Sequence, residues 1–366
     1  MSVRSSVLAG IREGVPRTGP LTVHIDVTNA CNAACVTCWD HSPLLASPRS
    51  GEWKKKRMDL CRFRTLMEDL DRFGSVSAII VSGMGDPLVN PEIYEMLAEV
   101  KSRDLHLTVL TNLVAADIDQ LARARVDQLL VGVHGASPAT HMAFHPGWTE
   151  RHFHDLCRYL RVLQQLGTQT RFVNVINRDN AHELSEMVRF GKSFGTERVN
   201  FKLASLFAGT EACSIDAQQR RELSTRSIPE AVALAAELGV RTNLDLFAQQ
   251  IAAAEGSARA TTPIADVGCY MGHVYTRITV EGDVLYCCNT QVRVGSLDDA
   301  PLSVLWTGST WQALRERLAR GEYFPGCDKC GKFEQNLKWA QRVASAGIPR
   351  APATSAPADV RLRVVS

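Results

Sequence analysis

The chain has 366 residues, of which 45% are hydrophobic and 22% are charged, and its formal net charge at pH 7 is +2. This length fits one large domain with a smaller one, and the small net charge gives no indication of a nucleic-acid partner. No run of about 18 apolar residues predicts a membrane span, and the N-terminus lacks the apolar core of a signal peptide, so we expect a cytoplasmic protein with no membrane partner.

Extended runs and amphipathic segments alternate along residues 21–255, which follow an N-terminal extension of residues 1–20. Apolar residues at helical spacing fill the intervals between the extended runs. This alternation predicts an α/β protein with a parallel sheet, and six units fit a partial (β/α)6 TIM-like barrel better than a closed eight-stranded one. The predicted strands are Leu21–Val27, Val76–Ser82, Leu105–Thr111, Val126–Val133, Gln169–Ile176 and Arg198–Ala204.

The later part of the chain changes character. A helical stretch is predicted at Ala217–Leu238, and the following "VRTNLDL" could form one further strand. Small and polar residues at 256–264 indicate a linker, and the cysteine-bearing residues 265–335 indicate a small second domain. Residues 336–366 are rich in Ala and Pro, which predicts a disordered tail.

Three cysteines, Cys31, Cys35 and Cys38, follow the first predicted strand in the loop "TNACNAACVTCWD". Eleven cysteines without a secretion signal are typical of metal ligands more than of disulfides. Thiolates at this spacing can bind one iron–sulfur cluster, and three ligands on a four-iron cluster leave one iron open. A structural zinc site would need a fourth ligand, which His41 could supply.

The CxxxCxxC loop followed by Trp39 resembles the signature of the radical S-adenosylmethionine (SAM) enzymes. The resemblance implies a 4Fe–4S cluster whose open iron binds SAM, and an electron donor such as flavodoxin or ferredoxin. It further implies cleavage of SAM to a 5′-deoxyadenosyl radical that abstracts a substrate hydrogen. Trp39 resembles the aromatic residue whose backbone meets the adenine.

The segment "SGMGDP" at the end of the second predicted strand resembles the GGEP motif of the same family, with Asp where Glu is usual. Read alone, the segment is only a sharp turn. Because the carboxylate is one methylene shorter, we expect backbone carbonyls to carry more of the contact with the SAM ammonium group. The SAM contacts that the resemblance implies are Gly83, Met84, Gly85, Asp86 and Pro87 at this turn, and Ser137 and Asn174 near the ribose or adenine.

Polar side chains interrupt strands that a buried parallel sheet would keep apolar. His24 and Asp26 lie on the first predicted strand, Asn174 on the fifth and Lys202 on the sixth, and His134 follows the fourth. Buried polar groups need partners, so this set predicts a polar ligand at the carboxyl ends of the strands. Taken singly, His24 and Asp26 could equally pair with each other or with strand neighbours as satisfied core groups.

Four later cysteines resemble the ligands of a Twitch-type auxiliary domain of the SPASM/Twitch group: Cys269, Cys287, Cys327 and Cys330. The resemblance implies a second 4Fe–4S cluster, fully ligated by cysteine, with a β-hairpin near "EGDV" bringing the first two together. Two distant cysteines with a CxxC pair also suit structural zinc. Cys288 could replace its neighbour as the ligand.

The leading hypothesis is a radical SAM oxidoreductase that oxidises a polar substrate by two electrons, the second going to the auxiliary cluster. The resemblance supports either a sugar- or aminocyclitol-like metabolite of natural-product biosynthesis, or a peptide or protein. About twenty residues before the first strand are too few for a peptide-recognition module, which favours the metabolite. A non-catalytic iron–sulfur or zinc scaffold is the remaining alternative.

The catalytic residues are less well indicated than the cysteine ligands. A free thiol could return a hydrogen atom to a substrate radical, which leaves epimerisation and cross-linking open beside oxidation. The candidate catalytic residues are Cys213, Cys288, His134 and Lys202.

Overall fold

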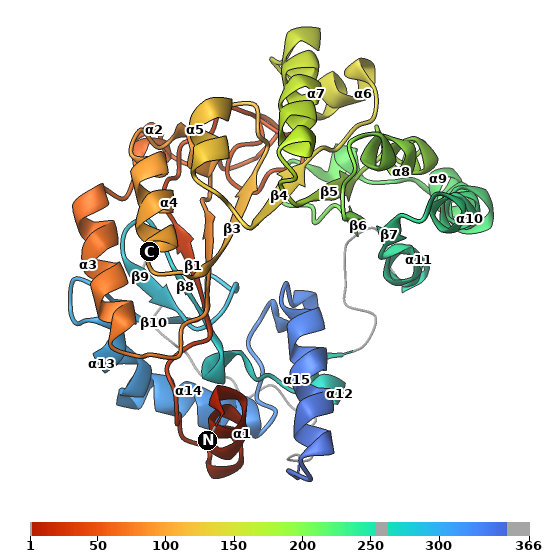
Figure 1. The fold of residues 1–366 in the computed structure, drawn as a ribbon. Coiled ribbons are helices and arrows are strands. Elements are labelled where there is room, and N and C mark those ends of the chain that lie inside the picture. The colour runs from red at the N-terminus through yellow and green to blue at the C-terminus, as the bar shows by residue number, and fades with distance from the viewer. Residues whose placement is uncertain (1, 254–262, 350–366) are drawn as a thin grey trace. The chain divides into compact units, whose positions relative to one another are not determined.

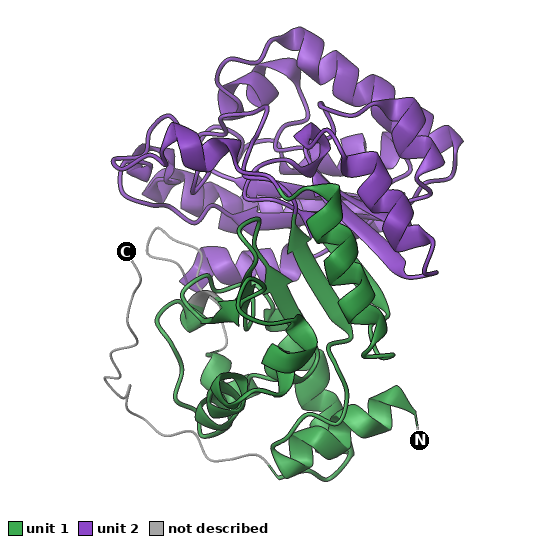
Figure 2. Ribbon diagram, turned by 90° about the vertical axis from the view of Figure 1, so that its left-hand side faces the viewer, with its two compact units in different colours: residues 1–26, 58–80, 262–366 green, residues 27–57, 81–261 purple. Residues whose placement is uncertain are grey.

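The computed structural model describes residues 2–253 and 263–349, so most of the predicted linker lies outside the described residues. Two compact units make up the chain (Figure 2). Unit 1 comprises residues 1–26, 58–80 and 262–366, and unit 2 comprises residues 27–57 and 81–261. Within the described ranges, no helix combines the length and apolar character needed to cross a membrane.

Unit 2 is built from parallel strands that alternate with helices (Figure 1). Strands β3, β4, β5, β6 and β7 pair side by side in this order, each parallel to the next. The strands are β2 (Ala78–Ser82, which begins in unit 1), β3 (His106–Thr111), β4 (Gln128–Gly132), β5 (Thr170–Ile176), β6 (Arg198–Leu203) and β7 (Arg241–Thr242). Six predicted strands, counting β1 of unit 1, therefore form within a residue or two of their expected bounds.

Helices connect these strands and pack their apolar sides against the sheet. Helix α7, for example, buries Phe153, Leu156, Leu160 and Leu163, which recur at helical spacing. The helices and helical turns of unit 2 are α2 (Gly51–Lys55), η1 (Pro87–Val89), α4 (Ile93–Lys101), α5 (Ile118–Arg123), α6 (Pro138–Phe144), α7 (Glu150–Gln165), α8 (Leu184–Ser193), η2 (Glu211–Cys213), α9 (Ala217–Glu222), η3 (Leu223–Ser227), α10 (Ile228–Leu238) and α11 (Leu244–Ala253).

The segment "VRTNLDL" is a strand for only two residues, so most of that expectation was wrong. The side chain of Asn243 accepts a hydrogen bond from the Phe201 N–H (2.7 Å) and donates one to its carbonyl (2.9 Å). The side-chain amide of Asn243 thus takes the place of the backbone hydrogen bonds that would continue the pairing of β7 with β6. From Leu244 onward, apolar residues at helical spacing begin α11, which buries Leu244, Phe247 and Ile251.

The strands of unit 1 include both parallel and antiparallel pairings. Strand β1 pairs in parallel with β8, while β8–β9 and β9–β10 are antiparallel. The predicted hairpin at "EGDV" turns at Gly282, whose φ of +86° favours glycine. The elements are α1 (Val3–Glu13), β1 (Thr22–Asp26), α3 (Leu60–Asp71), α12 (Ile264–Val267), η4 (Met271–His273), β8 (Tyr275–Ile278), β9 (Asp283–Leu285), β10 (Arg293–Ser296), α13 (Leu302–Thr307), α14 (Ser309–Ala319), η5 (Cys327–Lys329) and α15 (Phe333–Ser345).

The predicted disordered tail overlaps helix α15, so its expected start at residue 336 was wrong. Asn336, Trp339 and Val343 recur at helical spacing and are buried. This buried side gives the helix tertiary contacts that its Ala-rich composition did not suggest. Residues 350–366 of that tail lie outside the described part of the chain.

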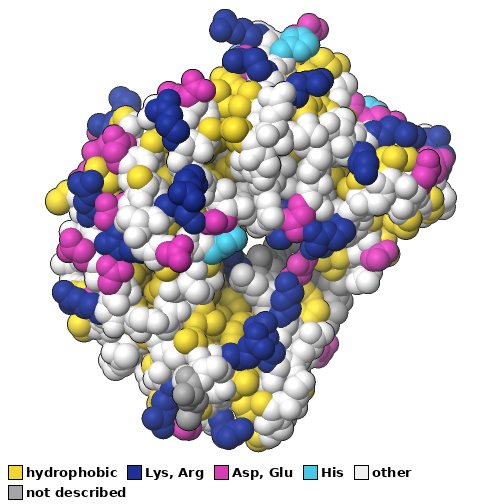
Figure 3. Space-filling view, in the orientation of Figure 1, with side chains coloured by type: hydrophobic (Ala, Val, Ile, Leu, Met, Phe, Trp, Pro, Cys, Tyr) yellow, Lys and Arg dark blue, Asp and Glu magenta, His cyan; other side chains and the backbone are white. Residues whose placement is uncertain are grey.

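The surface matches the balanced composition. Figure 3 shows basic and acidic side chains interspersed on the visible face. This distribution agrees with a net charge of +2.

Candidate functional site

Cys31, Cys35 and Cys38 share one loop of unit 2 and lie close enough to affect one another's ionisation. Burial raises the pKa of Cys31 to about 12, and burial likewise raises that of Cys35. The backbone N–H of His41 donates to Cys38 Sγ (3.3 Å). Clustered, partly buried thiols with N–H donors aimed at sulfur suit a site where a metal deprotonates them, so these residues fit an iron–sulfur cluster.

Hydrogen bonds from outside the motif hold this loop in place. Trp148 Nε1 donates to the carbonyl of Asn32 (3.0 Å), and the Val36 N–H donates to the carbonyl of Phe144 (3.0 Å). The side-chain amides of Asn32 and Asn112 bond to each other in both directions (2.8 and 3.3 Å). Neither Asn32 nor Trp148 stood out in the sequence.

The Gly83–Asp86 turn lies directly against the cysteine loop. A Cβ on Gly83 would lie 2.2 Å from the carbonyl oxygen of Thr28, and one on Gly85 would lie 1.8 Å from that of Ala30. The N–H of Asp86 donates to the same Ala30 carbonyl (2.9 Å). Only glycine permits this backbone approach.

We therefore expect Gly85→Ala to weaken SAM binding and to lower the free energy of unfolding by about 1–3 kcal/mol, because the new methyl group displaces backbone. Gly51→Ala is the matched control, since nothing lies within 4 Å of its Cβ position. Isothermal titration with SAM and urea denaturation measure the two effects. If the two variants had equal SAM affinity and equal free energy of unfolding, the close approach of Gly85 to the backbone of Ala30 would not be required.

The Asp86 carboxylate is fully engaged within the protein. It accepts hydrogen bonds from Thr111 Oγ1 (2.9 Å), the Asn112 N–H (2.7 Å) and the Leu88 N–H (3.0 Å). Burial raises the pKa of Asp86, and these donors oppose the rise. The side chain thus braces the turn, and direct contact of the backbone carbonyls with the SAM ammonium group stays a prediction.

The other residues expected near SAM lie where β4 and β5 of unit 2 end. Asn174 Oδ1 accepts from the His134 N–H (3.1 Å), and His134 Nδ1 accepts from the Val175 N–H (3.0 Å). Ser137 Oγ donates to Glu183 Oε1 (2.7 Å), a buried carboxylate that sequence reasoning missed. His134 stacks on Phe144, with ring centroids 4.3 Å apart, and burial holds the pKa of His134 well below its usual value.

Trp39 is half-exposed next to the cysteine loop. Its indole is 50% exposed, and its ring centroid lies 5.4 Å from that of Phe207, which is 46% exposed. The Nζ of Lys202 lies 5.9 Å from the Trp39 ring. An accessible cation and two aromatic faces are therefore gathered in unit 2 near the predicted SAM site.

Cys213 is buried in an apolar cluster with Val36 and Phe144, against which Cys35 packs. Its Sγ lies 3.7 Å from the Val36 carbonyl oxygen and donates to it. The thiol thus supports the cysteine loop, and a substrate radical has no access to it in this conformation.

Several buried histidines are neutral in the folded protein. Burial lowers the pKa of His141 and His273 to about 3 and that of His145 to about 4. The unfolded chain binds these protons near pH 6.5, so stability falls as the pH drops from about 6.5 toward 4.

We expect each of these histidines to remove about 2 kcal/mol of folding free energy between pH 7 and pH 5. Urea denaturation at both pH values measures the loss. His145→Gln should reduce the pH dependence by one histidine's share, whereas the same change at exposed His182 should leave it intact. If the urea concentration at the unfolding midpoint were the same at both pH values, the histidines would not be neutral groups of the folded protein with lowered pKa values.

The auxiliary cysteines all belong to unit 1. Cys269 interacts electrostatically with Cys327 and Cys330, and burial raises its pKa. Cys287 is hydrogen-bonded to Cys288 and interacts with Cys269. The structure therefore brings the four predicted ligands together, with Cys288 beside them.

Polar groups support these thiols from the backbone and from α15. The Asn289 N–H donates to Cys287 Sγ (3.4 Å), and Asn336 Nδ2 donates to Cys330 Sγ (3.6 Å). Within the described ranges, no group of three or more His, Cys, Asp or Glu could hold a single metal ion. A four-iron cluster keeps its thiolates further apart than one ion does, so this observation bears on the zinc alternatives alone.

A buried polar network crosses β1 and β8 of the same unit. Arg277 donates two hydrogen bonds to the Asp26 carboxylate (2.8 and 3.0 Å), and His24 Nδ1 shares one with the Tyr275 hydroxyl (2.8 Å). His24 Nε2 lies 3.6 Å from Asp26 Oδ1, and Lys332 Nζ lies 4.2 Å from the centre of the Tyr275 ring. His24 and Asp26 therefore face each other, as one of the two sequence interpretations held.

We expect Asp26→Asn to lower the free energy of unfolding by about 3–5 kcal/mol, because it leaves Arg277 buried without its counter-charge. The matched control is Asp283→Asn, which breaks the more exposed pair with Arg293 and should cost at most about 1 kcal/mol. Chemical denaturation of both variants under anaerobic conditions tests this. Similar losses of unfolding free energy in the two variants would mean that the buried pair stabilises the protein no more than the exposed one.

The comparisons with known proteins agree with this geometry. A family model described as the radical SAM superfamily matches residues 25–191, and one described as an iron–sulfur cluster-binding domain, SPASM, matches residues 269–331. A tungsten-containing aldehyde ferredoxin oxidoreductase cofactor-modifying protein from Pyrococcus furiosus is 23% identical over 187 residues, covering 48% of this chain and 49% of that protein. The chain thus spans about half of that relative.

An AdoMet-dependent heme synthase from Nitratidesulfovibrio vulgaris is 22% identical over 326 residues and covers 83% of both chains. Among solved structures, SuiB of Streptococcus suis bound to S-adenosylmethionine superposes with a TM-score of 0.62 at 14% identity, covering 96% of this chain and 80% of that one. The anSMEcpe structure with bound AdoMet gives a TM-score of 0.61 at 14% identity, covering 87% and 85%. These neighbours confirm the predicted fold, a partial barrel followed by a cysteine-rich domain.

Proposed function

Because the chain belongs to the radical SAM superfamily and carries a C-terminal SPASM iron–sulfur domain, we propose that it is an oxidoreductase that removes hydrogen from a polar substrate. The observation that carries the proposal is the contact between the three-cysteine loop and the Gly83–Asp86 turn in unit 2. A scaffold protein would not require glycine backbone to pack directly beside three thiols for which the described residues supply no fourth ligand.

The residues that would hold the cofactors fall into two sets. Cys31, Cys35 and Cys38 would hold the cluster that binds SAM, and a second 4Fe–4S cluster would be held by Cys269, Cys287, Cys327 and Cys330. When bound and reduced, the first cluster with SAM supplies the 5′-deoxyadenosyl radical that abstracts the substrate hydrogen. The chain itself positions the turn through Asp86 and fixes the loop through Trp148.

A sugar- or aminocyclitol-like metabolite is the first substrate class that we propose. The exposed Lys202 and the half-exposed Trp39 of unit 2 suit a polar molecule with several hydroxyl groups. Oxidation is favoured over epimerisation, since Cys213 is buried and bonded to Val36 and so is poorly placed to return a hydrogen atom.

Radical modification of a peptide or protein is the second candidate. Its support comes from the structural neighbours, one of which is SuiB bound to the precursor peptide SuiA, with a TM-score of 0.62 at 14% identity. The half-exposed Trp39 and Phe207 could pack against peptide side chains as readily as against a sugar ring.

The test is an anaerobic assay with reconstituted protein, dithionite and SAM. Deuterated candidate substrates of both classes are incubated with the enzyme, and the isotope in 5′-deoxyadenosine is measured by mass spectrometry. Transfer of deuterium from one class identifies it as the substrate. A reconstituted protein that forms no 5′-deoxyadenosine under any condition would refute the proposal.

A further inference from the structure

Helices α1 and α15 of unit 1 line an open hollow of about 430 Å³ that the proposed chemistry does not use. Arg4 lines it from α1, and Lys338 and Arg342 line it from α15, beside the amide of Gln341 and the hydroxyl of Ser345. A second hollow of about 250 Å³ shares Arg4 and Arg342 with the first. We call the surface formed by Arg4, Lys338 and Arg342 the basic hollow; α1 and α15 are labelled in Figure 1.

The basic hollow concentrates positive charge in a chain that is otherwise nearly neutral. Its lining holds three cations and no aspartate or glutamate. Arg4 and Lys338 are exposed, and the guanidinium of Arg342 lies 4.7 Å from the centre of the Trp339 ring. Stacking on the indole leaves the N–H groups at the edge of the guanidinium available for carboxylates or phosphates.

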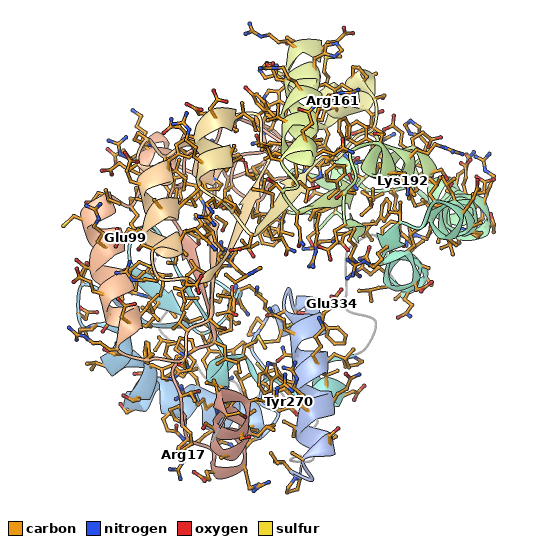
Figure 4. The ribbon with its side chains drawn as sticks, viewed as in Figure 1. Arg17, Glu99, Arg161, Lys192, Tyr270 and Glu334 are labelled. Atoms are coloured by element: carbon orange, nitrogen blue, oxygen red, sulfur yellow. The ribbon has the colours of Figure 1, made fainter. Side chains whose placement is uncertain are left out.

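Helix α15 connects the basic hollow to the auxiliary cysteines. Asn336 is fully buried, donates to Cys330 Sγ (3.6 Å) and accepts from the N–H of Tyr270 (2.8 Å), which Figure 4 labels. Trp339, three residues further along the helix, is buried and lines the second hollow. At a rise of ~1.5 Å per residue, Asn336 and Arg342 are separated by about 9 Å along the helix axis.

We propose that the basic hollow docks a small acidic electron-carrier protein, which exchanges single electrons with the auxiliary cluster. The inference rests on the proposed function only in requiring that this cluster is present. One electron leaves the reduced carrier and enters the oxidised cluster, and the reverse transfer removes the electron that substrate oxidation delivers. No bond is formed or broken in this step.

Charge complementarity is the reason to choose an acidic protein as the occupant. Cations around a shallow, open depression steer an oppositely charged surface and favour rapid, salt-sensitive association. Electron carriers such as flavodoxins present acidic surfaces and must approach a cluster closely. The basic hollow offers both the charge and a short route along α15.

The test replaces all three cations in the variant Arg4→Glu/Lys338→Glu/Arg342→Glu and uses reduced flavodoxin as the probe. We expect the dissociation constant for flavodoxin, measured by isothermal titration, to be at least ~10-fold larger than that of the wild-type protein. Stopped-flow experiments should show that the auxiliary cluster is reduced more slowly by a similar factor. The wild-type rate should fall with added salt, and the variant rate should depend on salt much less. Formation of 5′-deoxyadenosine with dithionite should remain unchanged.

The matched control is Arg189→Glu/Lys192→Glu on α8, where both cations are exposed; Figure 4 labels Lys192. Iron content and circular dichroism verify folding, and the neutral variant Lys338→Gln/Arg342→Gln provides a milder second test. Wild-type affinity and rates in the charge-reversed protein would overturn the proposal, as would binding of inorganic phosphate that leaves flavodoxin unaffected. Failure of wild-type protein to cleave SAM with dithionite would instead refute the proposed function, since flavodoxin binding and cluster reduction are measured separately.

Discussion

Replacing Cys31, Cys35 and Cys38 together with alanine is expected to abolish formation of 5′-deoxyadenosine while leaving the auxiliary cluster in place. The three thiols share one loop of unit 2, whereas the auxiliary cysteines belong to unit 1. Loss of one site therefore removes no ligand from the other. Iron per chain should fall by about half, because each site holds one four-iron cluster.

Iron analysis, electron paramagnetic resonance and a dithionite assay for SAM cleavage measure these outcomes on anaerobically purified protein. Cys61→Ala/Cys157→Ala is the matched control, since these cysteines lie on helices α3 and α7 outside both sets. The control should keep full iron content and SAM cleavage. A triple variant that still cleaves SAM, or that loses all iron, would contradict the separation of the two sites.

The cysteine motifs could be predicted from the sequence because their ligands are close in the chain or follow a recognisable spacing. The Gly83–Asp86 turn was found for the same reason, since its glycines have a local backbone role. By contrast, the partners of these motifs are distant in sequence. Trp148 bonds to Asn32 from 116 residues away, and no local pattern indicates that pairing.

The polar network of unit 1 illustrates what the sequence leaves open. His24 and Asp26 were recognised as unusual on a buried strand, but two interpretations remained. Their partners Tyr275 and Arg277 lie 251 residues away on β8, and the parallel register of β1 with β8 decides the contacts. Pairing of distant strands is set by the whole fold, which local propensity does not encode.

The contacts of Asp86 give it a different role from the one that the sequence suggested. The sequence suggested a shortened carboxylate near the SAM ammonium group. Its oxygens accept hydrogen bonds from Thr111, Asn112 and Leu88, so the side chain stabilises the turn. A shorter carboxylate is consistent with such a bracing task, because it caps the 3₁₀ turn that begins at Pro87.

Replacing Cys327 and Cys330 with alanine is expected to uncouple SAM cleavage from substrate oxidation. The cysteine loop of unit 2 is untouched, so dithionite-driven formation of 5′-deoxyadenosine should continue. In the proposed reaction the auxiliary cluster accepts the second electron of the substrate radical, and this variant lacks that acceptor. Oxidised product should therefore decrease by about 100-fold or more, equivalent to about 2.7 kcal/mol in the barrier.

Product and 5′-deoxyadenosine are quantified together by mass spectrometry, so that their ratio reports the coupling. Cys288→Ala is the matched control, since Cys287 is the assigned ligand and Cys288 lies beside it. The control should keep the auxiliary cluster and a near-normal ratio, whereas loss of the cluster would make Cys288 the ligand in place of Cys287. Full product formation in the Cys327→Ala/Cys330→Ala variant would show that the second electron leaves by another route, and it would remove the auxiliary cluster from the oxidation step.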